Sequence, residues 1–251
     1  MVNGAGLYVG SCTESLGGEY HARLGLFPLN RVLARSNRET RRLAYCGAMV
    51  LHDAAGDQVE TVGTVLSLTR FPLKSAQGEV LDEVHVGLDG LQDDRRWALR
   101  TGSGTAVTAK EAPQLRSVRA RSLQGSLEVS VGHELPASWT DALHVLAEVV
   151  GDEVELEDTP GGHQMAPVHL VSRGAVDGPA GCDGAEDTRA NVVLALAEPG
   201  AERSWLGRRL LLGSAELAVS RTPQHCLGVY CTVVTAGTVR VGDTARLGPP
   251  T

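Results

Sequence analysis

Short segments rich in β-branched and other apolar residues recur along most of this chain, and turns at Gly, Pro or Asp separate them. This pattern is typical of strands, and many short strands with few helices indicate a barrel or a sandwich. The segments with this pattern are 61–68, 80–86, 96–100, 115–119, 127–131, 154–156, 168–171, 191–196, 209–212, 216–220, 227–234 and 238–241. We therefore predict a mainly β fold, a β-barrel with mixed or antiparallel strands and a few helices.

One segment has helical periodicity instead. Its apolar residues recur at spacings of one, three and four, which places them on one face of a helix. Thr140 can cap the start of this helix, and Gly151 can end it. The apolar stripe consists of Leu143, Leu146, Ala147 and Val150.

Residues 1–58 differ in composition from the rest of the chain. Gly, Ser, Asn and Arg are frequent there, and neither a helical nor a strand period is sustained. An arginine cluster could form a basic arm for an acidic partner, but the lack of core-forming residues favours a poorly ordered leader, which we predict. Met49 offers a second possible start besides Met1. The arginines are Arg31, Arg35, Arg38, Arg41 and Arg42.

The overall composition narrows the class of protein. Hydrophobic residues make up 42% of the chain and the net charge is -7, which argues against binding to nucleic acid or to an anionic membrane surface. No apolar run approaches the ~20 residues that a membrane span needs, and the start does not resemble a secretory signal. The five cysteines are odd in number and scattered, so they form no disulfide framework. We predict a cytoplasmic protein.

The spacing of the residues argues against several common kinds of site. Gly102-Ser103-Gly104 lies between strand candidates and is predicted to be a hairpin turn, so the chain has no phosphate loop of the Walker or dinucleotide type. Cys226 and Cys231 have the spacing of the first pair in a plant-type iron–sulfur motif, but Val234 occupies the next required position. No cysteine pair has the two-residue gap of common structural zinc sites.

Two kinds of chemistry remain. One is a thiol beside an imidazole, Cys226 next to His225, in a segment that follows Pro223. The other is anion binding by cations at strand ends, for which arginine is well suited because its planar fork matches two oxygens. Each such residue alone is compatible with a solvated surface charge. The candidates are Lys74 and Ser75 after a proline, Arg95 beside Asp94, and Arg189 and Asn191 around the start of a strand.

The order of these motifs resembles the MOSC family, named for the C-terminal domain of molybdenum cofactor sulfurase. The N-terminal β-barrel pattern of that family resembles Arg70 to Ser75, Gly90 to Leu99 and Thr108 to Leu115; the MOSC domain proper resembles Ala166 to Val171, Arg189 to Val193, Trp205 to Leu210 and Thr238 to Asp243. The resemblance covers roughly residues 61–248. Besides the leader over 1–58, which the composition predicts, it implies an N-terminal β-barrel subdomain over 59–157 and a MOSC domain over 158–251.

The resemblance also implies a cofactor. Family members related to the mitochondrial amidoxime-reducing component bind a molybdenum cofactor, and a cysteine thiolate of the protein ligates the metal. Carried over by position, Lys74, Ser75 and Arg95 would hold the pterin phosphate or ring edge. Lys110, which stands where the family often has Arg, would contact the cofactor together with Arg189 and Asn191. Cys226 would ligate molybdenum, and His225 could donate a proton near it.

The chain departs from the family at the cysteine. The ligand usually follows an arginine, and a few dozen residues usually precede the next Gly-x-Tyr strand; here His225 precedes Cys226, and Leu227 to Tyr230 follow at once. Either Cys226 is the ligand and the excursion is lost, or both are lost and Cys226 belongs to the later strand. We favour the first, because Pro223 to Cys226 keeps the family's Pro-x-basic-Cys order.

Three functions stay open on this basis. The first is an oxidoreductase that reduces N-hydroxylated or N-oxygenated small molecules, with electrons from a separate reductase or ferredoxin-like protein. The second is a sulfur or cofactor carrier that uses a Cys226 persulfide and needs a sulfur-donor partner, because the chain has no pyridoxal-dependent desulfurase domain. The third is a degenerate, non-catalytic binding barrel.

Overall fold

The computed structural model describes residues 51–52, 58–132, 139–162, 165–178, 188–224 and 226–250. All of them belong to one compact unit, residues 49–251. The predicted leader falls almost entirely outside the described residues and stays a prediction, as does the division at residues 59, 157 and 158. No helix in the described part of the chain combines the length and the apolar character that a membrane crossing requires.

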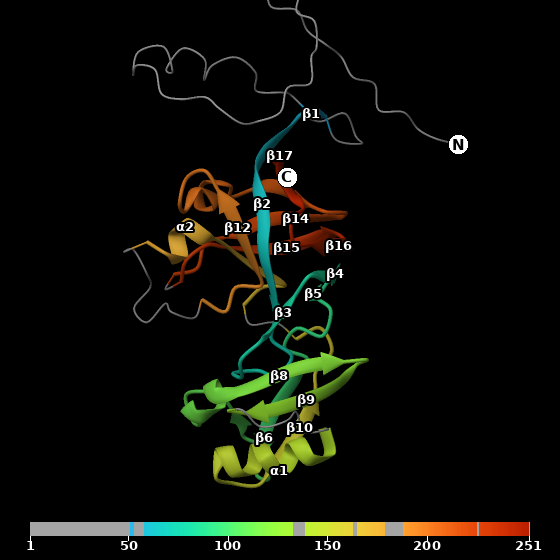
Figure 1. Cartoon of the computed structure of the whole chain (residues 1–251), viewed down its shortest axis with the longest axis vertical. Helices are drawn as coiled ribbons and strands as arrows, with labels where there is room; N and C mark the ends of the chain where they lie inside the picture. Colours follow the sequence, from blue (N-terminus) through green and yellow to red (C-terminus); the bar gives the residue numbers. More distant parts are fainter. Residues whose placement is uncertain are drawn as a thin grey trace, which may run out of the picture. The chain divides into compact units, whose positions relative to one another are not determined.

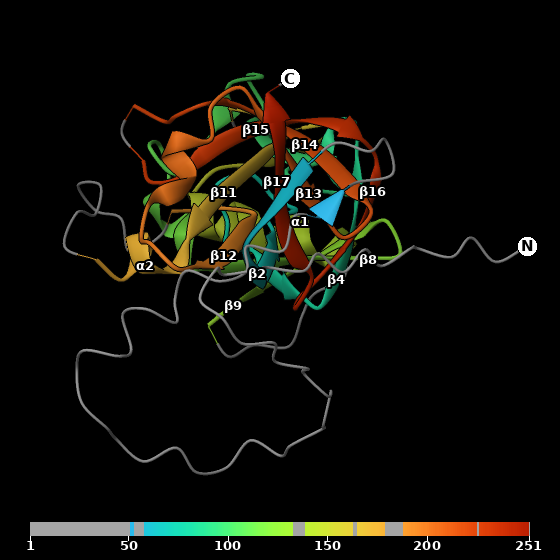
Figure 2. The same ribbon diagram turned by 90° about the horizontal axis from the view of Figure 1, so that it is seen from above.

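Seven strands close into a barrel (Figures 1 and 2). In order around it they are β2 (Gln58–Arg70), β12 (Val192–Leu196), β11 (Val168–Ser172), β15 (Val229–Thr235), β14 (Ala215–Arg221), β13 (Arg208–Leu212) and β17 (Thr244–Pro250). The β11–β12 pair is parallel, and the other neighbours are antiparallel. The short strands β1 (Leu51–His52) and β3 (Glu79–Leu81) pair with β2.

Strand β2 closes the barrel because it pairs on both sides. Leu68 lies opposite Val192 of β12, and Thr64 lies opposite Thr244 of β17. A side chain at Gly63 would place its Cβ 2.1 Å from the carbonyl oxygen of Ala195, so the close approach of β12 requires glycine there. The thirteen residues of β2 thus join distant parts of the chain.

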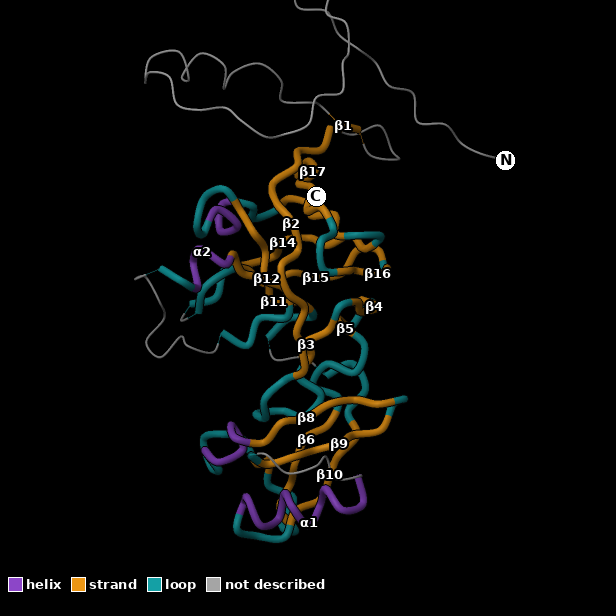
Figure 3. The backbone as a smooth tube through the Cα atoms, in the orientation of Figure 1, coloured by secondary structure: helices purple, strands orange, loops and turns teal. Residues whose placement is uncertain are grey.

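A second hydrophobic core is separate from the barrel core. It is enclosed by the sheet β10–β6–β7, the hairpin β8–β9 and one helix. The elements around it are grouped below the barrel in Figure 3. Their bounds are β6 (Trp97–Thr101), β7 (Ala106–Val107), β8 (Val118–Leu123), β9 (Ser126–Val131), α1 (Trp139–Val150) and β10 (Val154–Asp158). Leu99, Leu115, Leu127 and Leu146 are fully buried in this core, and such apolar burial is the main stabilising force for a body of this size.

A small sheet joins early and late parts of the chain. Strand β4 (Glu83–Gly87) pairs with β5 (Gly90–Leu91) and with β16 (Gly237–Arg240), and its inward residues extend the barrel core. The remaining regular elements of the described chain are α2 (Arg173–Val176) and two 3₁₀ helices, Pro113–Ser117 and Ala201–Ser204.

The predicted mainly β, mixed barrel fold is confirmed. The strand predicted over 115–119 is wrong in its first half, because Pro113 opens a 3₁₀ helix and strand β8 begins only at Val118. Helix α1 begins at Trp139, one residue before the predicted capping position. Gly151 does end the helix: its φ is +79°, and its N–H donates to the carbonyl of Ala147 at 2.8 Å.

Leu170 tests the barrel core. It lies in the fully buried strand β11, between β12 and β15, and truncation to alanine leaves a cavity there. Leu170→Ala should lower the free energy of unfolding by about 2–5 kcal/mol in urea titrations. Leu66→Ala on β2, whose residue is 41% exposed, is the control and should change it by less than about 0.5 kcal/mol. Equal effects of the two substitutions would show that β11 does not lie inside a packed barrel.

Candidate functional site

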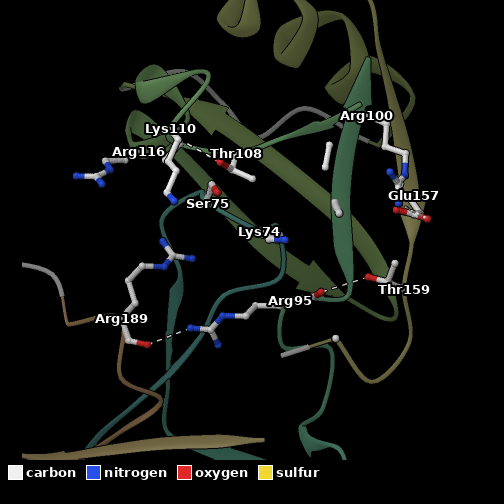
Figure 4. A pocket seen from close by; sticks show the side chains of 14 residues that line it. Lys74, Ser75, Arg95, Arg100, Thr108, Lys110, Arg116, Glu157, Thr159 and Arg189 are labelled. Carbon is white, nitrogen blue, oxygen red and sulfur yellow. Dashed lines mark hydrogen bonds and ion pairs between the residues drawn. The ribbon is translucent and has the colours of Figure 1, made fainter. Parts of the chain in front are cut away.

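A pocket of about 570 Å³ lies beside the outer face of the sheet β10–β6–β7 (Figure 4). The turn after β2 contributes Lys74 and Ser75, the segment before β6 contributes Arg95, and the segment before β12 contributes Arg189. Lys110 comes from the turn after β7. Five of the six residues predicted to bind the cofactor therefore line one pocket.

The pocket is cationic although the whole chain carries a net charge of -7. Among its lining residues Glu157 is the single carboxylate. A concave surface of one sign concentrates ions of the opposite sign, so this pocket suits an anionic ligand. The cationic side chains that line it are Lys74, Arg95, Arg100, Lys110, Arg116 and Arg189.

Arg95 is held by a buried carboxylate. Its side chain is 6% exposed and forms an ion pair with Asp94, which is 2% exposed. Asp94 also accepts the backbone N–H of Phe71 through Oδ1 at 2.8 Å. A buried guanidinium without a paired carboxylate would be costly, so Asp94 is what lets Arg95 lie at the pocket wall.

Arg189 is fixed from two directions. Its Nη1 donates to the carbonyl of Ala76 at 2.5 Å, and its own carbonyl accepts from Nη2 of Arg95 at 3.1 Å. The guanidinium carbons of Arg95 and Arg189 lie 4.8 Å and 4.3 Å from the centroid of the Phe71 ring, which is cation–π distance. Phe71 therefore supports both arginines.

Lys74 and Ser75 occupy a tight turn. The N–H of Ala76 donates to the carbonyl of Leu73 at 3.2 Å, and Ser75 has a φ of +73°, as the third residue of a type II turn requires. The N–H of Lys74 donates to the carbonyl of Trp97 at 2.8 Å, which ties the turn to β6.

Backbone strain gathers at the pocket. Within the described ranges five residues other than glycine have a positive φ, and three of these are Ser75, Arg95 and Arg189. Such conformations cost about 1–3 kcal/mol each and persist where the surroundings fix them, often at ligand sites. The strain therefore agrees with a binding role for this pocket.

A hydrogen-bonded turn presents Lys110 (Figure 4). Thr108 donates to the carboxylate of Glu111 from its hydroxyl at 2.5 Å and from its N–H at 2.9 Å. These bonds from Thr108 hold the pKa of Glu111 below its ordinary value, so this carboxylate stays charged and fixes the turn.

Asn191 does not line the pocket. It is 1% exposed, its Oδ1 accepts the N–H of His169 at 3.1 Å, and its Nδ2 donates to the carbonyl of Thr69 at 3.2 Å. The side chain thus connects the start of β12 to β11 and β2. The predicted direct contact with the cofactor stays a prediction.

Cys226 is also not among the residues that line the pocket. It is half-buried in the loop between β14 and β15, and its carbonyl accepts Nη1 of Arg203 at 3.2 Å. The next residue, Leu227, packs against Ala190, the neighbour of Arg189. His225 falls outside the described residues. Strand β15 begins at Val229, so Cys226 precedes that strand, and its role as the molybdenum ligand stays a prediction.

Cys231 is a poor metal ligand. It lies in β15 with no exposed surface, and burial raises the pKa of its thiol to about 12, which leaves it protonated at neutral pH. Across the described segments, no three His, Cys, Asp or Glu side chains gather in a metal-binding group.

The sequence predictions missed Arg100, Arg116, Glu157 and Thr159, which also line the pocket. Arg100 alternates with buried residues on β6, and Glu157 follows the half-buried Leu156 on β10, so the strand period predicts that each side chain faces away from the second core. The sequence does not show which strands pair. Only the pairing of β6 with β10 brings Arg100 and Glu157 together.

One comparison with known proteins identifies a family over part of the chain. Residues 62–159 match the family model of the MOSC N-terminal beta barrel domain, so the predicted resemblance to the MOSC family is confirmed over that stretch. MOSC domains are associated with molybdenum-cofactor proteins. The relation to the amidoxime-reducing component stays a prediction.

No curated protein matches the chain. Among solved structures, that of the YuaD protein from Bacillus subtilis is similar, with 12% identity and a TM-score of 0.41. The match covers 77% of this chain and 98% of that chain.

His169 should make stability depend on pH. Its ring Nε2 bonds the carbonyl of Leu227 at 2.8 Å, and burial, the main cause, lowers its pKa below the ordinary 6.5. As pH falls below 6.5 the unfolded chain therefore takes up a proton that the folded chain does not, and stability falls.

The expected slope reaches at most about 1.4 kcal/mol per pH unit, measured by urea unfolding between about pH 5 and 6.5. His169→Gln removes the titrating group while it keeps a side-chain donor for Leu227. Its slope should be shallower than that of the unmodified protein. Identical slopes would mean that His169 titrates normally in the fold.

Proposed function

We propose that this protein binds the molybdenum cofactor in the cationic pocket, and that it acts as an oxidoreductase on N-hydroxylated or N-oxygenated small molecules. The observation that carries the proposal is the convergence of Lys74, Arg95, Lys110 and Arg189 on one space (Figure 4). The association of MOSC domains with molybdenum-cofactor proteins supports this choice of cofactor, and the cationic lining of the pocket supports the binding of a phosphate there.

The charges fit a phosphate ester. Such a group carries about two negative charges at neutral pH and has three strong acceptor oxygens. Lys74 and Lys110 make no ion pair with a carboxylate in the described part of the chain, so both can balance that charge. Arg95 adds a guanidinium whose position is set before the ligand arrives, which lowers the cost of binding.

The bound cofactor would supply two-electron redox chemistry. The residues of this chain would bind its phosphate and fix its position, and Cys226 is the proposed thiolate ligand. The reaction breaks the N–O bond of the substrate, consumes two electrons and two protons, and releases water. A separate reductase or ferredoxin-like protein would supply the electrons. His225 is the proposed proton donor.

A second function is favoured by the position of Cys226. Because this residue does not line the pocket, a protein that holds the cofactor through its phosphate alone is consistent with the described geometry. Such a protein would carry the cofactor or, with a sulfur donor, pass sulfur from a Cys226 persulfide. Cys226→Ala separates the two functions: it abolishes reduction by an oxidoreductase but leaves a phosphate-held cofactor bound.

The test is the amount of pterin that the protein retains after expression in a host that makes the cofactor. Oxidation of purified protein should release a fluorescent pterin. Lys110→Ala removes one charged hydrogen bond, worth about 1.5–3 kcal/mol, and should lower cofactor affinity about tenfold or more.

Arg121→Ala is the matched control. Arg121 pairs with Glu128 at 2.5 Å in the β8–β9 hairpin and does not line the pocket, so this variant should retain as much pterin as the unmodified protein. The proposal fails if the unmodified protein releases no pterin. It also fails if Lys110→Ala retains as much as Arg121→Ala.

A further inference from the structure

The pocket has two sides (Figure 4). Lys110 and Arg189 lie on one side, and on the other the pocket runs over the outer face of the sheet β10–β6–β7. On β6 the alternation places Leu99 in the second core and Ala98 and Arg100 toward the pocket. In the register of the sheet, Ala98 lies opposite Glu157 of β10, and Arg100 lies opposite Ala106 of β7. These four residues all line the pocket.

Two of the four have the smallest side chain that a strand can present. Ala98 and Ala106 are diagonal neighbours across β6 and β7, so their methyl groups leave an open, flat apolar area on the face of the sheet. A planar ring can lie on such an area and bury apolar surface on one side. Larger residues at these positions would fill it.

Arg100 and Glu157 add hydrogen-bonding groups at the same face. Nε of Arg100 donates to Oε2 of Glu157 at 2.8 Å, and Nη2 donates to Oε1 at 3.2 Å. The third nitrogen, Nη1, donates to the carbonyl of Gly104 at 3.0 Å. The guanidinium plane is therefore held in place along the edge of the pocket.

This pair is accessible to a ligand. The side chains are 41% and 38% exposed, and an exposed ion pair of this kind stabilises a fold by only about 0–1 kcal/mol. Each carboxylate oxygen can accept a second hydrogen bond, and two guanidinium N–H groups remain besides the three already used. The pair thus offers acceptors beside donors.

We propose that Ala98 and Ala106 form the floor for the pterin ring, and that Glu157 and Arg100 recognise its edge. A pterin edge carries an amino group and a ring N–H beside a carbonyl oxygen. Carboxylates accept from ring amino groups, and arginine donates to ring carbonyl oxygens, as in the reading of guanine and cytosine. This inference rests on the proposed function, since it assigns the far end of the same pocket.

The test compares two probes on the full chain by calorimetric titration. Neopterin monophosphate has both the ring and the phosphate, whereas glycerol phosphate has the phosphate alone. The unmodified protein should bind neopterin monophosphate at least about tenfold more tightly than glycerol phosphate, because only the pterin ring can reach Arg100 and Glu157. Glu157→Gln should remove most of that preference and leave binding of glycerol phosphate unchanged.

A second variant tests the floor of the ring site, and a control variant tests for effects outside the pocket. Ala98→Ile fills the floor with a residue that favours strands, so it should weaken neopterin monophosphate and not glycerol phosphate. Glu128→Gln alters an ion pair outside the pocket and should change neither affinity. Equal thermal unfolding midpoints of Glu157→Gln and Glu128→Gln show that the first variant folds.

The outcomes separate the two claims. Equal binding of both probes by the unmodified protein overturns the ring site and leaves the phosphate site standing. A preference that survives both Glu157→Gln and Ala98→Ile also overturns the ring site. Failure to bind either probe overturns the proposed function itself.

Discussion

The buried ion pair between Asp94 and Arg95 is the interaction on which the pocket depends. A charge placed out of water needs a partner and satisfied hydrogen bonds, and here both are provided within a few residues. The N–H of Arg95 donates to the carbonyl of Phe71 at 2.7 Å, and Asp94 accepts the N–H of Phe71 in return. The pair therefore fixes the chain that leaves β2 against the chain that enters β6.

The same arginine reaches the late part of the chain. Its Nη2 donates to the carbonyl of Arg189, and the Phe71 ring lies within cation–π distance of both guanidiniums. Residues more than ninety positions apart are held together in this way. The positive φ values of Arg95 and Arg189 persist because several contacts fix each residue, and the result is a cationic wall set before a ligand binds.

The sequence predicted the strands well because alternation and turn residues act locally. It missed β17, which closes the barrel by pairing with β2 and β13. The strand ends in Gly248, Pro249 and Pro250, which are uncommon inside strands. The sequence pattern also predicted a strand at Leu115, although Pro113 and a fully buried Leu115 fit a 3₁₀ turn packed on the second core. Such packing is not visible in a local pattern.

The candidate site was predictable only in part. The order of motifs identified Lys74, Ser75, Arg95, Lys110 and Arg189, and these do line one pocket. Asn191 has the polarity of a ligand-binding residue, but its side chain bonds the backbone of His169 and Thr69 just before β12 begins. Arg100 and Glu157 belong to no motif that the sequence analysis recognised. They come together because β6 pairs with β10, which a local pattern does not show.

The most direct test of the central claim is a crystal structure of the protein isolated with its cofactor, with molybdenum located by anomalous scattering. The account predicts phosphate density within hydrogen-bond distance of Lys74, Arg95, Lys110 and Arg189. A cofactor phosphate bound anywhere else on the chain would contradict it.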